Sequence, residues 1–389
     1  MQGINVTKSK KKIAFVVAIP ITATAFLMEH IAVLMRFYDV HLICNFPNDE
    51  SKKPFEELGL KCHSVPIQRN INVSGDLKGL IALVKVFKME KYQCVHSVTP
   101  KAGLLTALAG WMAGVPNRVH IFTGQVWATR KGIMRLMLKG MDRLIAKLNT
   151  RLLVDGESQR RFLIKEGVLT EKNSIVPAEG SIAGIKLDRF VISKDVREEE
   201  RKRIGLKEDD VVFIFLGRLN HDKGIGELYE AFNRLIPVCE NAKLVFYGID
   251  EEGYEEKVSN YSNIKRGVNY FFPGLTNTPY QALQAGDVFV LPTWREGFGV
   301  SVLEAQALAL PVITSDAYGV VDASVEGVTG LRCGVNDPEG LYWAMKKYYE
   351  NPDIRKRHGE AGRKRVEDKF NNEHVSQAWL NIYKDILGE

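Results

Sequence analysis

The stretch DVFVLPTWREGFGVSVLEAQALALP, residues 287–311, decides the fold because it contains a complete transition from a strand to a helix. After Asp287 it begins with an uncharged run that is typical of a buried strand. After Gly299 its apolar residues recur at helical spacing until Pro311 ends the pattern. The glycines between the two patterns predict a loop, so the stretch is one strand, loop and helix unit.

Two glutamates belong to this unit, Glu296 in the predicted loop and Glu304 in the first turns of the predicted helix. Because helical side chains lean toward the helix N-terminus, Glu304 points back at the loop, and both carboxylates face one crevice. The free backbone N–H groups of Phe298, Gly299 and Val300, together with the helix dipole, suit a phosphate. A carboxylate accepts two hydrogen bonds, which fits the vicinal diol of a sugar. The combination predicts a nucleotide-sugar site.

Strand-like runs alternate with helix-length segments over nearly the whole chain. The runs are KIAFVVAI, DVHLICNF, CVHSVT, NRVHIFT and TRLLVDG in the first half, and DVVFIFLGR, AKLVFYG, DVFVLPT and PVITSD in the second. A break falls between Gly180 and Gly205, where SKDVREEERKR is a charge run. The pattern predicts two doubly wound, Rossmann-like α/β domains, residues 1–190 and 191–389, whose strand ends face one another across a cleft. We expect the last helix to pack back on the first domain.

The composition fits two globular domains and distributes its charge unevenly between them. The 389 residues are 45% hydrophobic and 26% charged, which excludes a fibrous or disordered chain. Residues 1–190 carry 28 lysines and arginines against 15 acidic residues, whereas the remainder carries 25 against 32. The basic first half predicts an anionic partner, which is nucleic acid, a membrane surface or a phosphorylated substrate.

The cysteines and the N-terminus indicate a cytoplasmic protein. The five cysteines are scattered and form no Cys-x-x-Cys pair, so neither a disulfide framework nor a zinc site is predicted. KSKKK followed by the uncharged run from Ile13 to Met28 imitates a secretory signal. However, Pro20 interrupts that run, which is also shorter than the ~18 residues of a membrane span. We therefore predict that it begins with a buried first strand.

Cationic and polar residues at other predicted strand ends are further candidates for the cleft. Arg218 and Lys223 follow the strand VVFIFL, where their charges suit a diphosphate that becomes a leaving group. In the first domain, Lys101 opens a helix after CVHSVT. HIFTGQ brings His120, Thr123 and Gly124 to another strand end. Since side chains alternate along a strand, His120 and Thr123 lie on different faces, and at most one of them points into the cleft. A lone histidine at such a position is more often structural than catalytic.

The segment TRKGIMRLMLKGMDRLIAKLNTR predicts an amphipathic helix with a basic stripe. The stripe has a cation at every fourth position, namely Lys131, Arg135, Lys139, Arg143 and Lys147. The apolar residues fall on the other side of the wheel, where we expect them to pack on the sheet. With Asp142 as its one acid, the outward stripe predicts contact with anionic lipid headgroups. Nucleic acid is not expected, because no aromatic residues interleave for base stacking.

Several motifs together resemble a known enzyme family. They are GRLNHDKG (217–224), FFPGLTN (271–277), ALQAGDVFVLPTWREGFGVSVLEAQALALPVITSD (282–316) and GVTGLRC (327–333). In this order they resemble the retaining GT-B glycosyltransferases of family four. HSVTPKAGLL (96–105) is similar to the subgroup that builds capsular polysaccharides and O-antigens. The resemblance spans nearly the whole chain.

The resemblance implies roles for particular residues. Arg218 and Lys223 would hold the donor diphosphate, Glu304 the ribose hydroxyls, and Glu296 the donor sugar near the anomeric carbon. The backbone from Phe298 to Val300 would touch sugar and phosphate, and the main chain of Phe272, Gly274 and Leu275 would lie by the nucleobase. Such enzymes need no divalent metal or other cofactor and retain the anomeric configuration.

The chain departs from the family pattern in its first domain. Many members have a glycine-rich loop after the first strand, where this chain has AIPITATAFL. They also have a histidine at the position of Thr123, before the glycine aligned with Gly124. These departures concern the acceptor side and leave the donor site intact.

The sequence therefore predicts a hexosyl- or N-acetylhexosaminyl-type transferase without a metal. It would act at the inner face of the cytoplasmic membrane, and move sugar from a uridine diphosphate donor to a lipid-linked saccharide. Two alternatives remain open. One is a nucleotide-sugar epimerase of the same fold, and the other is a non-catalytic protein that binds carbohydrate or nucleic acid.

Overall fold

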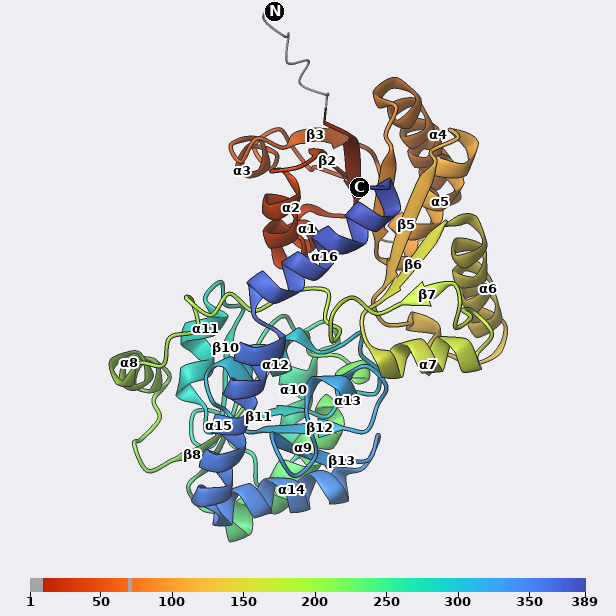
Figure 1. The fold of residues 1–389 in the computed structure, drawn as a ribbon. Coiled ribbons are helices and arrows are strands. Elements are labelled where there is room, and N and C mark those ends of the chain that lie inside the picture. The colour runs from red at the N-terminus through yellow and green to blue at the C-terminus, as the bar shows by residue number, and fades with distance from the viewer. Residues whose placement is uncertain (1–9, 69–71) are drawn as a thin grey trace, which may run out of the picture.

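The computed structural model describes residues 10–68 and 72–389, which form two α/β domains (Figure 1). The sheet of the N-terminal domain has seven parallel strands in the order β3-β2-β1-β4-β5-β6-β7. Their bounds are β1 Lys12–Val16, β2 Asp39–Cys44, β3 Lys61–Ser64, β4 Cys94–Val98, β5 Asn117–Phe122, β6 Arg151–Val154 and β7 Ser174–Ile175. Its helices are α1 Pro20–Phe26, α2 Met28–Leu34, α3 Lys53–Glu56, α4 Val73–Glu90, α5 Pro100–Met112, the 3-10 helix η1 Val126–Thr129, α6 Gly132–Leu148 and α7 Glu157–Lys165.

The C-terminal domain has a six-stranded parallel sheet in the order β10-β9-β8-β11-β12-β13. Its strands are β8 Val211–Leu216, β9 Ala242–Tyr247, β10 Tyr270–Gly274, β11 Val288–Leu291, β12 Val312–Ser315 and β13 Gly330–Cys333. The α-helices are α8 Lys194–Ile204, α9 Ile225–Leu235, α10 Tyr254–Lys257, α11 Pro279–Ala282, α12 Val300–Ala307, α13 Val320–Ala323, α14 Pro338–Glu350, α15 Pro352–Lys369 and α16 Asn372–Leu387. The 3-10 helices are η2 His221–Lys223, η3 Ile236–Val238, η4 Val258–Asn260 and η5 Leu283–Ala285.

Both sheets are doubly wound, which confirms the predicted fold class. In each sheet the strand order reverses at the first strand, between β1 and β4 in one domain and between β8 and β11 in the other. Ligands of such sheets bind at the carboxyl ends of the strands beside this reversal. The fold therefore marks one candidate ligand position in each domain.

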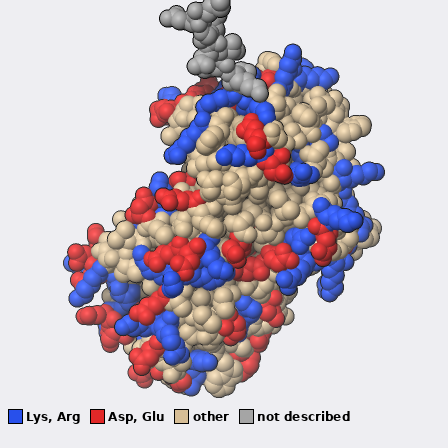
Figure 2. Space-filling model, in the orientation of Figure 1, with Lys and Arg blue, Asp and Glu red and all other residues tan. Residues whose placement is uncertain are grey.

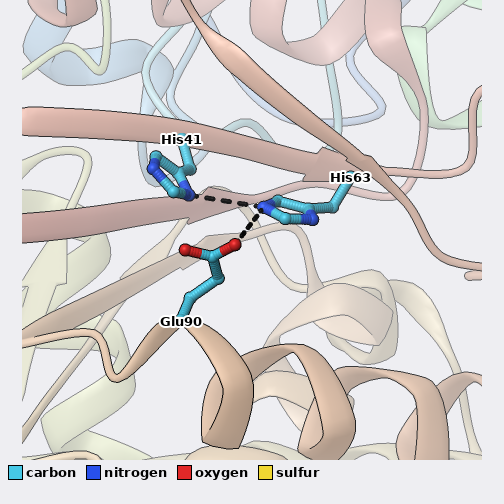
Figure 3. Close-up of side chains that lie close together, drawn as sticks. All are labelled: His41, His63 and Glu90. Carbon is cyan, nitrogen blue, oxygen red and sulfur yellow. Dashed lines mark hydrogen bonds and ion pairs between the residues drawn. The ribbon is translucent and has the colours of Figure 1, made fainter.

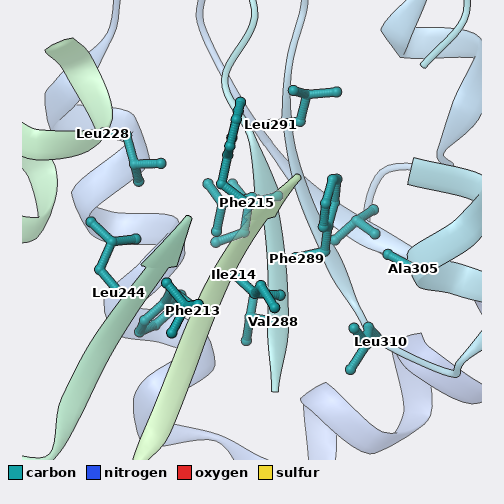
Figure 4. Close-up of a cluster of buried hydrophobic side chains, with 14 of the residues drawn as sticks. Phe213, Ile214, Phe215, Leu228, Leu244, Val288, Phe289, Leu291, Ala305 and Leu310 are labelled. Atoms are coloured by element: carbon teal, nitrogen blue, oxygen red, sulfur yellow. The ribbon is translucent and has the colours of Figure 1, made fainter. Parts of the chain in front are cut away.

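Helices cover both faces of each sheet, so the central strands are buried on both sides. Figure 4 shows this core in the C-terminal domain, where Phe213 and Phe215 of β8 pack with Leu228 of α9 and Phe289 of β11. The first strand is equally central. Ile13 and Phe15 of β1 are fully buried between β2 and β4, which confirms that the apolar run after KSKKK begins with a buried strand.

The last helix returns to the N-terminal domain (Figure 1). Val375, Trp379 and Tyr383 of α16 join the hydrophobic cluster that contains Ile13 and Phe15. The Trp379 ring stacks on His30 of α2 with 4.5 Å between ring centroids. The chain thus passes between the domains twice, once before α8 and once between α15 and α16.

The surface differs between the domains. In the view of Figure 2 the two signs of charge are interspersed over the C-terminal domain, whereas larger areas without charged side chains lie over the N-terminal domain. In the part of the chain that the structure describes, no helix combines the length and the apolar character needed to cross a bilayer.

Candidate active site

The two domains meet where strands of both sheets end. Gly124, after β5, has a φ of +82° and packs so closely on the loop after β11 that a Cβ atom there would lie 3.0 Å from the Gly297 nitrogen. The same Cβ would lie 3.3 Å from the Glu296 carbonyl carbon. Thr123 and Gly124, predicted on the acceptor side, therefore line the loop that carries Glu296.

Glu296 forms an ion pair with Lys223, so the structure brings these two predicted residues together. Both side chains are mostly buried, with exposed fractions of 17% for Lys223 and 20% for Glu296. The position of Lys223 depends on Gly224, because a Cβ atom at Gly224 would lie 2.1 Å from the Pro292 carbonyl oxygen. Close contact between η2 and the end of β11 thus places the lysine beside the glutamate.

Arg218 pairs with a carboxylate that the sequence did not single out. Its Nη1 lies 3.0 and 2.9 Å from the two carboxylate oxygens of Glu251, which follows β9. The Asn220 side-chain amide also donates to Glu251, at 2.8 Å. Both predicted diphosphate-binding cations are therefore held by acidic side chains, which an entering diphosphate would have to replace.

Glu304 differs from these paired residues. It lies in α12, and among the described residues no group forms a hydrogen bond or ion pair with its carboxylate. Burial raises the pKa of the Glu304 carboxyl to about 7. A half-buried carboxylate without a protein partner is suited to accept hydrogen bonds from a ligand.

The loop between these glutamates is anchored by Phe298. Its ring is buried 5.4 Å from the Phe370 ring, and a Cβ atom at Gly180 would meet it at 2.6 Å. Gly299 adopts a φ of +99°, and α12 begins at the next residue, Val300. No acceptor among the described residues takes the backbone N–H groups from Phe298 to Val300, as an anion site at a helix start requires.

The segment predicted to contact the nucleobase lies on the edge strand β10. The Gly274 carbonyl accepts a hydrogen bond from the Gly248 N–H at 2.9 Å, which ties β10 to the end of β9. Leu275 is 67% exposed. A cavity of about 350 Å³ opens beside Phe272, with Arg203 and Arg266 in its wall.

Two residues predicted on the acceptor side are held inside the first domain. The Lys101 ammonium pairs with Asp76 of α4 at 2.7 Å. His120 is buried, its Nδ1 lies 2.9 Å from the Ser97 hydroxyl, and burial lowers its pKa to about 3. His120 therefore has a structural role. Thr99, which precedes the Lys101 helix, adopts a strained φ of +76°, and this feature was not evident from the sequence.

Side chains that join the domains were also not predicted. The Ser158 hydroxyl of α7 donates to Asp322 of α13 at 2.7 Å and accepts from the Gly319 N–H at 2.7 Å. The Phe162 ring stacks on Tyr318 with 4.2 Å between centroids. The carboxyl group of Asp155, directly after β6, is buried against the Glu296 loop. The sequence did contain one sign that Asp155 could reach the cleft, namely its position directly after a strand.

The apolar face of α6 was expected to pack on the sheet, and this prediction is wrong because much of that face is exposed. Arg135 and Lys139 turn toward Glu166, directly after α7, at 2.9 and 2.6 Å, and Arg143 donates to the Gly167 carbonyl at 3.0 Å. Asp142 is buried and accepts a hydrogen bond from the Trp127 indole, so its carboxylate does not neutralise the cations of the stripe. The exposed face is mainly apolar and contains Ile133, Met134, Leu136, Met137 and Leu144. Three cations of the predicted stripe, Lys131, Arg143 and Lys147, remain exposed.

One group of potential metal ligands was found among the described residues, and it lies outside this site (Figure 3). His63 Nε2 is 3.3 Å from His41 Nδ1 and 3.7 Å from Glu90 Oε1. Lys12 and Lys61 bind the Glu90 carboxylate at 2.8 and 2.7 Å, so its charge is already neutralised. The cluster lies toward the amino ends of β1 and β2, away from the strand ends that form the candidate site.

Comparisons with known proteins agree with this geometry. Residues 196–365 match the family model described as glycosyl transferases group 1, and residues 23–179 match the glycosyl transferase 4-like domain. The chain is 31% identical over 351 residues to the capsular polysaccharide biosynthesis glycosyltransferase CapM of Staphylococcus aureus, covering 90% of this chain and 91% of CapM.

A second relative and a solved structure extend the comparison. The chain is 31% identical over 324 residues to the UDP-Gal:alpha-D-GlcNAc-diphosphoundecaprenol alpha-1,3-galactosyltransferase of Escherichia coli, covering 80% of this chain and 81% of that enzyme. The fold is similar to Anabaena HepE in complex with UDP-glucose, with a TM-score of 0.80 at 15% identity over 96% of this chain and 99% of HepE.

Proposed function

The chain belongs to the family-four glycosyltransferases, which have the GT-B fold, and we propose that it is a retaining, metal-independent hexosyl- or N-acetylhexosaminyltransferase. In this proposal the donor is a uridine diphosphate sugar and the acceptor is a lipid-linked saccharide of surface polysaccharide synthesis. The relatives support this choice, because the Escherichia coli enzyme is named for a UDP donor and an undecaprenol-linked acceptor.

The observation that carries the proposal is the arrangement of charges around the Glu296 loop. Arg218 and Lys223 hold acidic side chains that a diphosphate would replace, while the Glu304 carboxylate has no partner among the described residues. Together with the free N–H groups at the start of α12, they provide separate positions for a diphosphate and for a diol. Two cations beside the diphosphate stabilise the charge that grows on it as it leaves, which is why we propose that no metal ion is needed.

The proposed reaction is a substitution at the anomeric carbon with retention. The acceptor hydroxyl oxygen forms the new bond on the face from which the diphosphate departs. The bond between the anomeric carbon and the phosphate oxygen breaks, its electron pair stays on that oxygen, and the diphosphate takes the hydroxyl proton. Glu296 would contact the sugar near this carbon, and Lys223 would hold the departing phosphate.

We also propose that α6 contacts the cytoplasmic membrane, where a lipid-linked acceptor resides. The exposed apolar side chains of Ile133, Leu136 and Met137 would enter the interface, and Lys131 and Lys147 would lie beside anionic headgroups. This surface combines two cations of the expected basic stripe with exposed apolar side chains. Peripheral attachment needs no spanning helix.

A donor screen tests the function. Purified protein is mixed with a panel of uridine and guanosine diphosphate sugars in the presence of a chelator, and thermal shift and slow release of nucleoside diphosphate are measured. We expect one uridine diphosphate sugar to stabilise the protein and Arg218→Ala to weaken that shift. Arg234→Ala is the matched control, because Arg234 is ion-paired to Glu339 outside the cleft and is similarly exposed. Stabilisation by no donor, or release only with added Mg²⁺, would contradict the proposal.

A further inference from the structure

Asp155 is an acidic residue of the N-terminal domain that reaches the Glu296 loop of the C-terminal domain. It directly follows β6 and is buried, with 4% of its surface exposed. A Cβ atom on Gly297 would lie 2.6 Å from Asp155 Oδ2 and 3.0 Å from the Thr123 carbonyl carbon. Gly297 therefore occupies a slot between Thr123 and Asp155, and the carboxyl group is packed against the residue that follows Glu296.

The surroundings of this carboxyl group disfavour its charge. Its Oδ1 atom has no hydrogen-bond partner among the described residues, and a backbone hydrogen bond with Ile182 acts to lower the pKa of the carboxyl group. The charged groups that act on it are Glu296 and Asp322 of α13, and both are acidic. Burial, followed by these two acids, raises the pKa of Asp155 to about 8.

The backbone of Asp155 is fixed, so the side chain cannot leave by a loop movement of its own. The Asp155 N–H lies 3.2 Å from both the Phe122 carbonyl and the Gln159 side-chain oxygen, and its carbonyl accepts from the Ser181 N–H at 2.7 Å. Gln159 in turn donates to the Gln125 side chain at 3.2 Å. If Asp155 ionises, we therefore expect the Glu296 loop on the opposite side to move away from it.

We propose that Asp155 is a positioning residue for glycosyl transfer: as a neutral acid it lets the Glu296 loop close against the N-terminal domain, and as a carboxylate it drives that loop and Glu296 away. Asp155 does not touch the donor in this scheme. It sets the placement of Glu296 and of the neighbouring Lys223. The inference rests on the proposed function, since the loop matters only if Glu296 contacts the donor sugar.

The pH profile of kcat at saturating donor tests this inference. For a single group that ionises at about 8, wild-type kcat falls about tenfold between pH 7 and pH 9. Asp155→Asn keeps the shape and remains neutral, so we expect it to keep most of the activity at pH 7 and to lose the decline. Asp155→Ala removes the contact and is expected to lower kcat at every pH. Asp142→Asn is the control, because Asp142 is also a buried acid of the first domain but contacts Trp127 outside the cleft.

Each outcome decides the proposal. A decline that disappears in Asp155→Asn and persists in Asp142→Asn supports it. If kcat declines equally in the wild type, Asp155→Asn and Asp142→Asn, another group causes the decline and the proposal is overturned. Loss of activity in Asp155→Asn at pH 7 also overturns it, because the neutral isostere should position the loop.

A measurement without substrate separates this inference from the proposed function. An acid whose pKa is raised by folding binds its proton more tightly in the folded state, so folding is penalised progressively as pH rises from about 4 to about 8. The melting temperature of Asp155→Asn should therefore exceed that of wild type at pH 8, and the difference should vanish near pH 4. No difference at pH 8 contradicts the neutral acid even if no sugar donor is ever found.

Discussion

The Glu296 loop and helix α6 were both predicted from strong sequence patterns, but only the loop points where its pattern suggested. Glu296 and Lys223 follow parallel strands, whose carboxyl ends meet at one edge of the sheet whatever packs around them. The face that α6 exposes depends instead on a neighbour that its own sequence does not contain. Glu166, directly after α7, binds Arg135 and Lys139, and apolar side chains of α6 are exposed instead. Topology therefore fixes a strand end, whereas a partner in another element fixes the rotation of a surface helix.

The largest expected effect tests the strand-end half of this comparison. Lys223→Ala removes a cation from the departing phosphate, and we expect kcat to fall about 10²- to 10³-fold. Lys243→Ala is the matched control, since Lys243 has a similar exposed fraction of 13% and is paired with Asp210 in the same domain. Equal kcat values for Lys223→Ala and wild type would show that a cation at this strand end does not stabilise the departing phosphate.

Glu304 gives a second test, which depends on pH. Because burial raises the pKa of its carboxyl to about 7, the carboxylate forms as pH rises through 7, and only the carboxylate accepts both hydrogen bonds of a diol. We expect the Kd of the donor to fall about tenfold from pH 6 to pH 8 in the wild type and to be insensitive to pH in Glu304→Gln. A parallel dependence in both proteins, measured by calorimetry, would assign the effect to another group.

The orientation of α6 is tested by flotation with anionic liposomes. Replacing Ile133, Leu136 and Met137 by serine removes apolar area from the exposed face, and we expect the bound fraction to drop severalfold. Replacing Arg135 and Lys139 by glutamine should leave flotation nearly unchanged, because both cations face Glu166. The reverse result would favour the basic stripe over the apolar face.

The smallest expected effect concerns the partner that rotates α6. Glu166→Gln should destabilise the protein by about 1 kcal/mol, because the carboxylate is partly buried between two cations. The hydrogen bond from Lys139 lowers the pKa of Glu166, so this contribution is present above the unfolded pKa and is lost as pH falls through the folded one. Urea unfolding at pH 7 and at pH 3 measures it, and an equal difference at both values would contradict the assignment.

The sequence predicted the strands whose apolar character is strong and missed those whose character is mixed. The nine apolar runs correspond to nine strands of the two sheets. The missed strands are short or interrupted. β3 is the half-exposed KCHS, β7 has two residues, β10 contains Pro273, and β13 contains Arg332. All four lie at the edges of the sheets, where a strand can be short or of mixed character and so gives no strong apolar pattern.

The same physical reason limits what was predicted of the candidate site. Arg218 and Lys223 were found because charge at a strand end is conspicuous in the sequence. Their partners in the unliganded protein, Glu251 above all, come from other loops and follow no spacing rule. Asp155 also stands at a strand end, but its importance comes from contact with Gly297 across the domain boundary. Contacts of that kind depend on how the domains close.

The return of α16 to the first domain has a consequence for the order in which the chain folds during synthesis. The cluster around Ile13, Phe15 and Leu42 includes Val375, Trp379 and Tyr383, which are synthesised after all strands of both sheets. The first domain therefore cannot complete its core until α16 has left the ribosome, although the strands of the second domain are made earlier. While the chain is growing, the groove that α16 later fills is open to chaperones and to other nascent chains.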